Sequence, residues 1–473
     1  MKHIRAIGFF LGLVLSLACF SKNIDTNFLK KRIPEMMDSA GVQGLSIGIV
    51  KKGKLVWSRN FGIANASLQK PVTQASVFEA ASLSKPLFAY ICMRLIEEGI
   101  LNLDKPIVEC VSRELIEKNF LGYKIQDNRF FKITPRMCLS HSAGFPNGGK
   151  YLVYEPATDM HYSGTGISLL QFVVETLTNK NLEILAQEYV FVPLGMDSSS
   201  YVWNEKKFAN NIVNGHGSGG QTGGFSRHAR PSASYTLITN GADYGKFLAM
   251  LLSQQNLKPE TYQEMWKVQS KAKTNFLASM TWGLGFGLYE TDLGTAFWHW
   301  GDMGIVKAYV VGIPEEKSGL VMLSNSANGL NMAYSLVNMC VGGGKHEFFH
   351  VLNIPQYDDA LSILMQRFSQ GGIEKVIESF NYYKIHHKYK VTQILLSQIT
   401  QRLLNLGRQQ EALNIAKINI LEFPENADAH NNLADVLLRM GKTTAAIGCY
   451  RRALQLNSKN TYARKQLATL KAL

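Results

Sequence analysis

The sequence predicts an α+β domain with an antiparallel sheet flanked by helices, followed by an all-α region of helical repeats. Two observations predict this fold class. Between Phe28 and about Leu323, short runs of strand-forming residues alternate with amphipathic helical patterns. From Gln356 onward strand signals almost disappear, and a period of 34 residues emerges near the end of the chain.

The composition is that of a folded protein with more than one domain. Of 473 residues, 46% are hydrophobic and 18% are charged, which excludes a disordered chain. Six cysteines without a C-x-x-C pair exclude a disulfide scaffold, a zinc ribbon and an iron–sulfur protein. The net charge of +14 favours an anionic partner but does not identify it.

The first residues have the pattern of a secretory signal peptide at 1–18. Lys2 and Arg5 precede an apolar run that ends at Ala18 and is too short to span a bilayer. Cys19 follows directly, as in bacterial lipoprotein signals, where the new N-terminal cysteine is acylated. We therefore expect an exported protein of the periplasm or outer envelope, either free or anchored through lipidated Cys19.

The α+β domain is expected to span 19–350. Gly44 to Val56 predicts two strands with a Lys-Gly turn, and Ser84 to Gly99 predicts an amphipathic helix that ends at Gly99. The glycine-rich segment Gly215–Gly224 is interpreted as a mobile surface loop. Late strands are expected to complete the antiparallel sheet; they lie near 288–289, 298–300, 308–313 and 318–323.

The end of the chain resembles two tetratricopeptide repeats at 393–426 and 427–460, closed by a capping helix to 473. Gly407 recurs as Gly441 and Ala412 as Ala446. Residues 351–392 are expected to be a helical linker or a degenerate third copy, because two repeats rarely bury enough surface alone. An unrelated helical bundle is the alternative.

The repeat region is also where much of the positive charge lies. After Gln356 there are 16 lysines and arginines against 9 acidic residues. This excess favours a protein partner for 393–473, through an acidic peptide or an anionic surface. A nucleic acid partner is not expected for an exported protein.

Ser82 and Lys85 form an S-x-x-K motif at a predicted helix start. Residues three apart lie on one helical face, so the Lys85 amine should lie beside the Ser82 hydroxyl. The helix N-terminus adds positive potential, and the backbone N–H of Ser82 can stabilise an oxyanion. This arrangement predicts nucleophilic catalysis, although the motif alone is weak.

Further segments follow Ser82 and Lys85 in order. Tyr162 lies before a predicted helix, and His299-Trp300-Gly301 forms H-x-G on a late strand. With these segments, residues 28–340 resemble the serine hydrolases related to class C β-lactamases, D-alanyl-D-alanine peptidases and esterases. The resemblance implies the β-lactamase/transpeptidase-like fold with an all-helical subdomain. It rests also on Gly41–Gly44, Leu101–Pro106, Ile133–Gly144, Pro193–Met196 and Trp282–Gly285.

The resemblance implies a role for each matching residue. Ser82 would be the acylated nucleophile, activated by Lys85 and Tyr162. We expect the positive charge of Lys85 to lower the Tyr162 pKa toward a phenolate. Backbone N–H groups of Ser82 and Asp302 would form the oxyanion hole, with His299 and Gly301 binding substrate. An inward-pointing Asp302 carboxylate would disfavour anionic substrates.

Gly164 is the main departure from the family pattern. It stands where Tyr-x-Asn supplies an amide that grips an amide substrate, and it offers only backbone. The departure favours an ester over a β-lactam or peptide, because ester hydrolysis needs mainly nucleophile, base and oxyanion hole.

Other histidines are expected to be structural. His346 to His350 matches H-E-x-x-H, but the flanking glycines and proline favour a simple turn over a zinc site. We expect His141 to satisfy local backbone and the pair His386-His387 to lie on a solvated face.

The sequence therefore predicts an exported serine hydrolase acting on a small or cell-wall-derived ester or D-amino-acid amide, with no cofactor and no metal. A true β-lactamase or penicillin-binding peptidase is one alternative. A catalytically weak interaction protein that works through its repeats is another. The substrate itself is left open.

Overall fold

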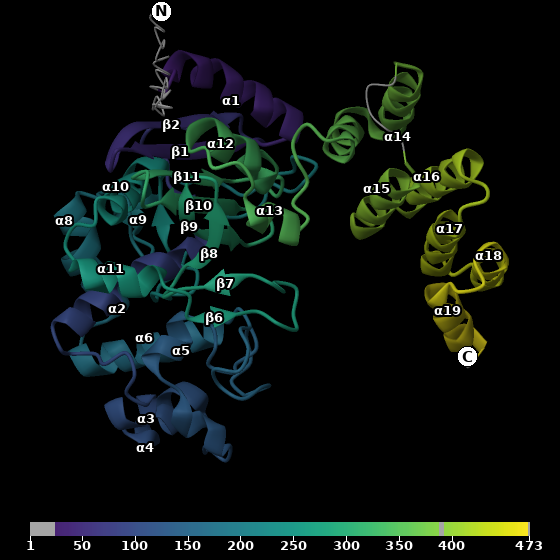
Figure 1. Ribbon diagram of the computed structural model, residues 1–473. Helices are drawn as coiled ribbons and strands as arrows, with labels where there is room; N and C mark the ends of the chain where they lie inside the picture. Colours follow the sequence, from purple (N-terminus) through teal and green to yellow (C-terminus); the bar gives the residue numbers. More distant parts are fainter. Residues whose placement is uncertain (1–23, 387–391, 472–473) are drawn as a thin grey trace, which may run out of the picture.

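The computed structural model describes residues 24–386 and 392–471. An α+β domain is followed by a row of tail helices that extends to one side and ends at the C-terminus (Figure 1). The predicted fold class is confirmed. The predicted signal peptide, Cys19 and His387 lie outside the described residues, and so does the side chain of His386.

A nine-stranded antiparallel sheet forms the centre of the α+β domain. Its strand order is β3-β2-β1-β11-β10-β9-β8-β7-β6. The first three strands are β1 (Gly44–Lys51), β2 (Lys54–Asn65) and β3 (Lys70–Pro71). The others are β6 (Ser270–Lys271), β7 (Thr281–Trp282), β8 (Gly287–Thr291), β9 (Gly294–Asp302), β10 (Lys307–Ile313) and β11 (Ser318–Ser324). A separate pair consists of β4 (Phe78–Glu79) and β5 (Ile238–Thr239).

Both faces of the sheet are buried, because helices cover each of them. Successive side chains of the central strands point to opposite faces and pack into the two cores. Tyr309 and Val311 of β10 pack on one face, and Val310 packs on the other. The first face is covered by α1 (Thr26–Ala40), α12 (Ala333–Cys340) and α13 (Glu347–Val351), with the short turn η5 (Gly329–Met332) beside them.

The second face is covered by α2 (Ser84–Glu97) and α10 (Gly241–Leu252), and α11 (Pro259–Trp266) lies against the same core. A helical subdomain continues this core below the sheet in Figure 1. It contains α3 (Ile107–Cys110), α4 (Arg113–Leu115), α5 (Pro135–Leu139), α6 (Gly164–Thr178) and α7 (Leu182–Ala186). The short helices α8 (Val192–Leu194) and α9 (Glu205–Phe208) lie beside α10, and Phe208 packs in a separate cluster with Val77 and Ile238. The turns η1 (Ala81–Leu83), η2 (Ile116–Leu121), η3 (Asn128–Lys132) and η4 (Gln187–Phe191) join these elements.

The predicted strands form where the sequence indicated them, but the glycine-rich segment behaves differently. We expected a mobile surface loop at Gly215–Gly224, but hydrogen bonds connect this segment to the sheet. The His216 ring is fully buried, accepts from the Ala66 N–H at 3.1 Å and bonds to the Asn325 carbonyl at 3.1 Å. Gly219 and Gln221 are exposed, whereas His216 pairs with Thr222 and Ser326, and Thr222 accepts from the Ser67 N–H.

The tail consists of helices packed pairwise. They are α14 (Ala360–His386), α15 (Gln393–Asn405), α16 (Gln409–Glu422), α17 (Ala427–Arg439), α18 (Thr443–Leu456) and α19 (Thr461–Lys471). A break at Gly371-Gly372 divides α14 into two helices, which gives the segment the helix–turn–helix form of a repeat. Gly407 and Gly441 have φ angles of 73° and 74° at equivalent turns, as the 34-residue period predicts.

Within the residues that the structure describes, no helix is both long enough and apolar enough to span a bilayer.

Candidate active site

Ser82 lies on the turn η1, two residues before α2 begins. The predicted helix start at Ser84 is confirmed, and Ser82 lies on the short turn just before it. Ala81 has a φ of 50°, in the left-handed region that non-glycine residues adopt rarely, so the chain turns sharply just before Ser82. Tyr244 stabilises this turn, because its hydroxyl donates a hydrogen bond to the Leu83 carbonyl at 3.1 Å.

The Lys85 amine reaches Ser82 as the spacing predicted. Its Nζ donates to Ser82 Oγ at 2.9 Å and to the Ser234 carbonyl at 2.7 Å. Lys85 is almost fully buried on the first turn of α2. The hydroxyl and the amine are therefore in direct contact, which is the arrangement that proton transfer requires.

Burial changes the proton affinities of the two candidate bases in opposite directions. It lowers the Lys85 pKa to about 7 because the charged ammonium is desolvated. It raises the Tyr162 pKa above the ordinary range, and the nearby Ser82 only moderates that rise. The expectation that Lys85 would lower the Tyr162 pKa toward a phenolate is wrong, because desolvation of the phenol dominates.

Aromatic rings enclose Tyr162. The Lys85 Nζ lies 4.9 Å from the centre of the Tyr162 ring. The ring centroids of His141 and Trp300 each lie 4.5 Å from that of Tyr162, and Trp282 lies 5.9 Å away. Sequence reasoning missed Trp282 and Trp300 as neighbours of Tyr162, although both lie in segments that carry the resemblance.

His141 holds the backbone beside Tyr162. Its Nδ1 accepts from the Ser163 N–H at 3.2 Å, which confirms the expected structural role. Its pKa falls to about 3 because the ring is buried and lies near Lys85, so the imidazole is neutral.

The end of β9 forms the opposite wall of the site. Its register with β8 ends at Trp298, and η1 packs against β9. At Gly301 an added Cβ would lie 2.6 Å from the Ala80 carbonyl oxygen, so only glycine permits this approach of strand and turn. The predicted oxyanion-hole residues Ser82 and Asp302 are thus brought to neighbouring backbone segments.

The Asp302 carboxylate is not an unpaired charge. It forms an ion pair with the Lys307 amine, and it accepts from the Gly304 N–H at 2.8 Å. We therefore no longer expect Asp302 to repel anionic substrates, because the charge of Lys307 neutralises the charge of its carboxylate.

His299 is fully buried, and its Nδ1 donates to the Trp300 carbonyl at 2.8 Å. Its Nε2 has no hydrogen-bond partner among the described residues. Desolvation first, and the nearby Lys85 second, hold the His299 pKa well below its ordinary value. His299 therefore offers a neutral ring with a bare acceptor close to the reaction centre.

Gly164 has a neighbour that sequence reasoning missed. Its N–H donates to Asn147 Oδ1 at 3.0 Å, and its carbonyl accepts from Ser234 Oγ at 3.0 Å. A Cβ at position 164 would lie 3.3 Å from Asn147 Oδ1. The carboxamide of Asn147 thus occupies space beside Gly164 that an asparagine at 164 would use. No sequence motif marks Asn147, because a folded loop places it there.

His346 of the H-E-x-x-H segment has a structural use. Its Nε2 donates to the Gly342 carbonyl at 2.9 Å, and its Nδ1 accepts from the Tyr289 hydroxyl at 2.8 Å. Both ring nitrogens are therefore engaged within the protein.

Two family models match the chain. The model described as Beta-lactamase covers residues 29–335. The model described as Tetratricopeptide repeat covers residues 427–460, which confirms that the tail contains such a repeat.

Known proteins are similar to parts of the chain. The human "Serine beta-lactamase-like protein LACTB, mitochondrial" is 31% identical over 126 residues, or 27% of this chain and 21% of that protein. The match thus spans about a fifth of that relative's length.

Two solved structures share the fold. The octameric penicillin-binding protein homologue from Pyrococcus abyssi has a TM-score of 0.57 and 23% identity, covering 71% of this chain and 79% of that one. The D-alanine carboxypeptidase AmpC from Burkholderia cenocepacia has a TM-score of 0.56 and 19% identity, covering 66% and 98%.

Proposed function

Because this chain belongs to the beta-lactamase family, we propose that it is a serine hydrolase that forms an acyl-enzyme on Ser82. The observation that carries the proposal is the contact of 2.9 Å between Lys85 Nζ and Ser82 Oγ, in a setting where burial lowers the Lys85 pKa to about 7. A neutral amine at this position can accept the serine proton near neutral pH.

The proposed reaction begins at this contact and adds Tyr162 as a proton relay. The Ser82 proton passes to Lys85 Nζ as Ser82 Oγ bonds to the substrate carbonyl carbon. The backbone N–H groups of Ser82 and Asp302 stabilise the oxyanion. The bond to the leaving oxygen or nitrogen then breaks, and that atom takes the proton from Lys85 through the neutral Tyr162 hydroxyl. A water molecule reverses these steps and releases the acid.

The substrate we propose is an ester or a D-amino-acid amide, either small or derived from cell wall. Gly164 favours an ester, because it carries no side-chain amide. Asn147 supports the amide as well, because its Oδ1 is bound to the Gly164 N–H and its NH2 group remains for a substrate carbonyl. This second observation keeps β-lactam or D-alanyl peptide hydrolysis as the runner-up, as in the name of the Burkholderia relative.

Active-site labelling tests the nucleophile. A fluorophosphonate or a labelled penicillin should modify the wild type and not Ser82→Ala. Equal labelling of both proteins would refute the mechanism. Turnover of a short acyl ester, a D-alanyl-D-alanine peptide and nitrocefin by the purified protein then ranks the substrate classes.

The alternative is an interaction protein whose repeats do the work. Absence of turnover on all three substrates, together with specific protein capture that is lost when repeat residues are substituted, would favour it. We also propose export with lipidation at Cys19, which rests on residues 1–19 alone. Palmitate labelling of the wild type and of Cys19→Ala tests this, and equal labelling would refute it.

A further inference from the structure

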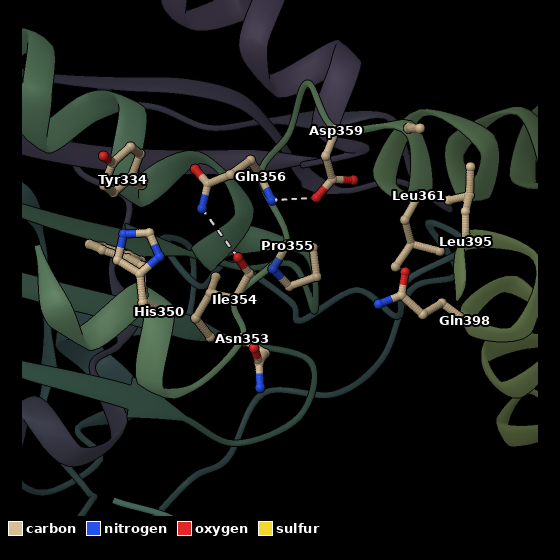
Figure 2. Close-up of a pocket in the computed structure, with 12 residues that line it drawn as sticks. Tyr334, His350, Asn353, Ile354, Pro355, Gln356, Asp359, Leu361, Leu395 and Gln398 are labelled. Atoms are coloured by element: carbon tan, nitrogen blue, oxygen red, sulfur yellow. Dashed lines mark hydrogen bonds between the residues drawn. The ribbon is translucent and has the colours of Figure 1, made fainter. Parts of the chain in front are cut away.

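The tail meets the α+β domain along a seam where α14 packs against α1, and the segment just before α14 is bonded to the domain. The Arg32 guanidinium donates to the Tyr357 hydroxyl at 2.6 Å, and the Tyr357 N–H donates to the Asn331 carbonyl at 2.8 Å. One cavity in this seam has Tyr334 and His350 on one side and Leu395 and Gln398 of α15 on the other (Figure 2). The first tail helices therefore lie against the catalytic domain.

A second and larger cavity lies in the same seam, with a volume of about 660 Å3. We call it the seam chamber. The catalytic domain contributes Asp302, Lys307, Asn328 and the glycine-rich turn at Ser218 and Gly219. The tail contributes Met365 and Phe368 of α14, and Arg402 and Asn405 of α15. Neither part alone would enclose this volume.

The seam chamber shares one residue, Asp302, with the proposed oxyanion hole. Asp302 lines the chamber, and it is also the residue whose backbone N–H is proposed to stabilise the oxyanion. Its neighbour Gly301 lies against the turn that carries Ser82. On β9, the chamber residue Asp302 therefore directly follows Gly301, the position that meets the turn carrying Ser82.

The charges of the chamber favour an anion. Of its lining residues, Asp302 is acidic, whereas Lys307, Arg402 and Arg408 are basic. Lys307 is paired with Asp302, and Arg408 Nε donates to Glu411 at 2.8 Å. In the described part of the chain, the exposed Arg402 guanidinium has no hydrogen-bond or ion-pair partner. Its planar fork suits a carboxylate or a phosphate.

The rest of the lining suits an apolar stem. Leu361, Met365 and Phe368 line the chamber from α14, and Leu330 and Ile354 line it from the catalytic domain. The Arg408 guanidinium lies 5.2 Å from the centre of the Phe368 ring, which fixes that ring in the wall. Apolar walls with one unpaired cation are the chemistry of a site for an amphiphilic group.

We propose that the seam chamber binds the distal part of the substrate, an apolar chain with an anionic end group that Arg402 recognises. The tail thereby completes the substrate site, and this inference rests on the proposed hydrolase function. The helical repeats are then a specificity element of the enzyme in addition to any partner they bind.

The test compares two aryl esters of equal acyl length, one ending in a methyl group and one ending in a carboxylate. The wild type should prefer the carboxylated ester. Arg402→Gln should lower kcat/KM for the carboxylated ester about tenfold more than for the methyl ester, since one charge-assisted hydrogen bond is lost. Arg402→Glu should invert the preference toward an ester with a terminal amine. Arg451→Gln is the matched control, because Arg451 is an exposed arginine of α18 that does not line the chamber.

Binding measurements separate this inference from the proposed function. Suberate and hexyl phosphate are titrated calorimetrically into the full chain, into Ser82→Ala and into Arg402→Gln. No ester turnover, with binding that Arg402→Gln weakens, would refute the hydrolase and support the chamber ligand. Equal selectivity in wild type and Arg402→Gln, with binding that the substitution leaves unchanged, would overturn the inference. Stronger binding of one ligand identifies the anionic group as carboxylate or phosphate.

Discussion

The side-chain nitrogen of Lys85 lies 4.9 Å from the centre of the Tyr162 ring, and burial shifts the pKa values of the two groups in opposite directions. The amine becomes easier to deprotonate, and the phenol becomes harder to deprotonate. The opposite pKa shifts make Lys85 the better proton acceptor of the two candidate bases, whereas the sequence motifs do not distinguish them.

The pH dependence of catalysis follows from this relationship. Since the Lys85 pKa is lowered to about 7, kcat/KM for a neutral ester should rise with pH and level off above about 7. Tyr162→Phe should reduce kcat/KM by about 100-fold, because the proton relay is lost, but the rise near pH 7 should remain. Initial rates between pH 5 and about 9 measure both effects. If the rise disappears in Tyr162→Phe, the tyrosine is the base.

The buried Lys85 should also cost stability. Below about pH 7 Lys85 is charged in both the folded and the unfolded chain, so the full cost of its burial is present. The cost shrinks as pH rises from about 7 toward the ordinary lysine value of 10.5, because the unfolded state then loses its charge too. Lys85→Met should therefore raise the free energy of unfolding by about 1–3 kcal/mol at neutral pH.

Urea unfolding at two pH values measures this gain, which should be smaller at the alkaline value. The exposed Lys206→Met is the matched control and should change little. A gain at Lys85 that does not vary with pH would show that packing, rather than the buried charge, produces it.

His141 should act on the site through position alone. His141→Phe keeps a ring against Tyr162 but removes the acceptor for the Ser163 N–H, which should cost about 1–3 kcal/mol and lower kcat/KM. His141→Asn should recover part of both losses, since a carboxamide oxygen can accept that bond and asparagine tolerates the φ of 57° at this position. Denaturation and ester hydrolysis provide the readouts. Equal losses in both variants would contradict the role of the hydrogen bond.

Much of the fold and part of the site could be predicted from sequence because local patterns specify them. The three-residue spacing of Ser82 and Lys85 predicted that their side chains meet. They do so even though Ser82 lies on the turn before the helix. The His299-Trp300-Gly301 segment forms a strand end because alternating apolar residues place it in the sheet.

The rest depends on contacts between segments far apart in sequence. The Ser234 carbonyl, which accepts from Lys85, lies 149 positions along the chain and carries no side-chain signal. The Tyr162 pKa is set by burial, which a motif does not report. Likewise, Arg402 reaches the seam chamber only because the first tail helices fold back on the catalytic domain.

Asn147 should decide how well the protein handles amides relative to esters. Asn147→Asp keeps an oxygen for the Gly164 N–H at 3.0 Å but removes the NH2 group that would donate to a substrate carbonyl. For an ester and an amide with the same acyl group, Asn147→Asp should lower the amide-to-ester ratio of kcat/KM by about tenfold. Because both substrates share one acyl group, the added charge affects both alike.

Gly164→Asn provides the complementary change. Alone it should gain little, since its Cβ would lie 3.3 Å from Asn147 Oδ1 and 3.4 Å from Ser234 Oγ, where Asn147 already supplies an amide. Combined with Asn147→Gly, which clears that space, Gly164→Asn should restore amide turnover that Asn147→Gly alone has lost. Parallel assays of the three variants measure this rescue. If Asn147→Gly leaves the ratio unchanged, the carboxamide does not contact substrate, and Gly164 alone defines that side of the site.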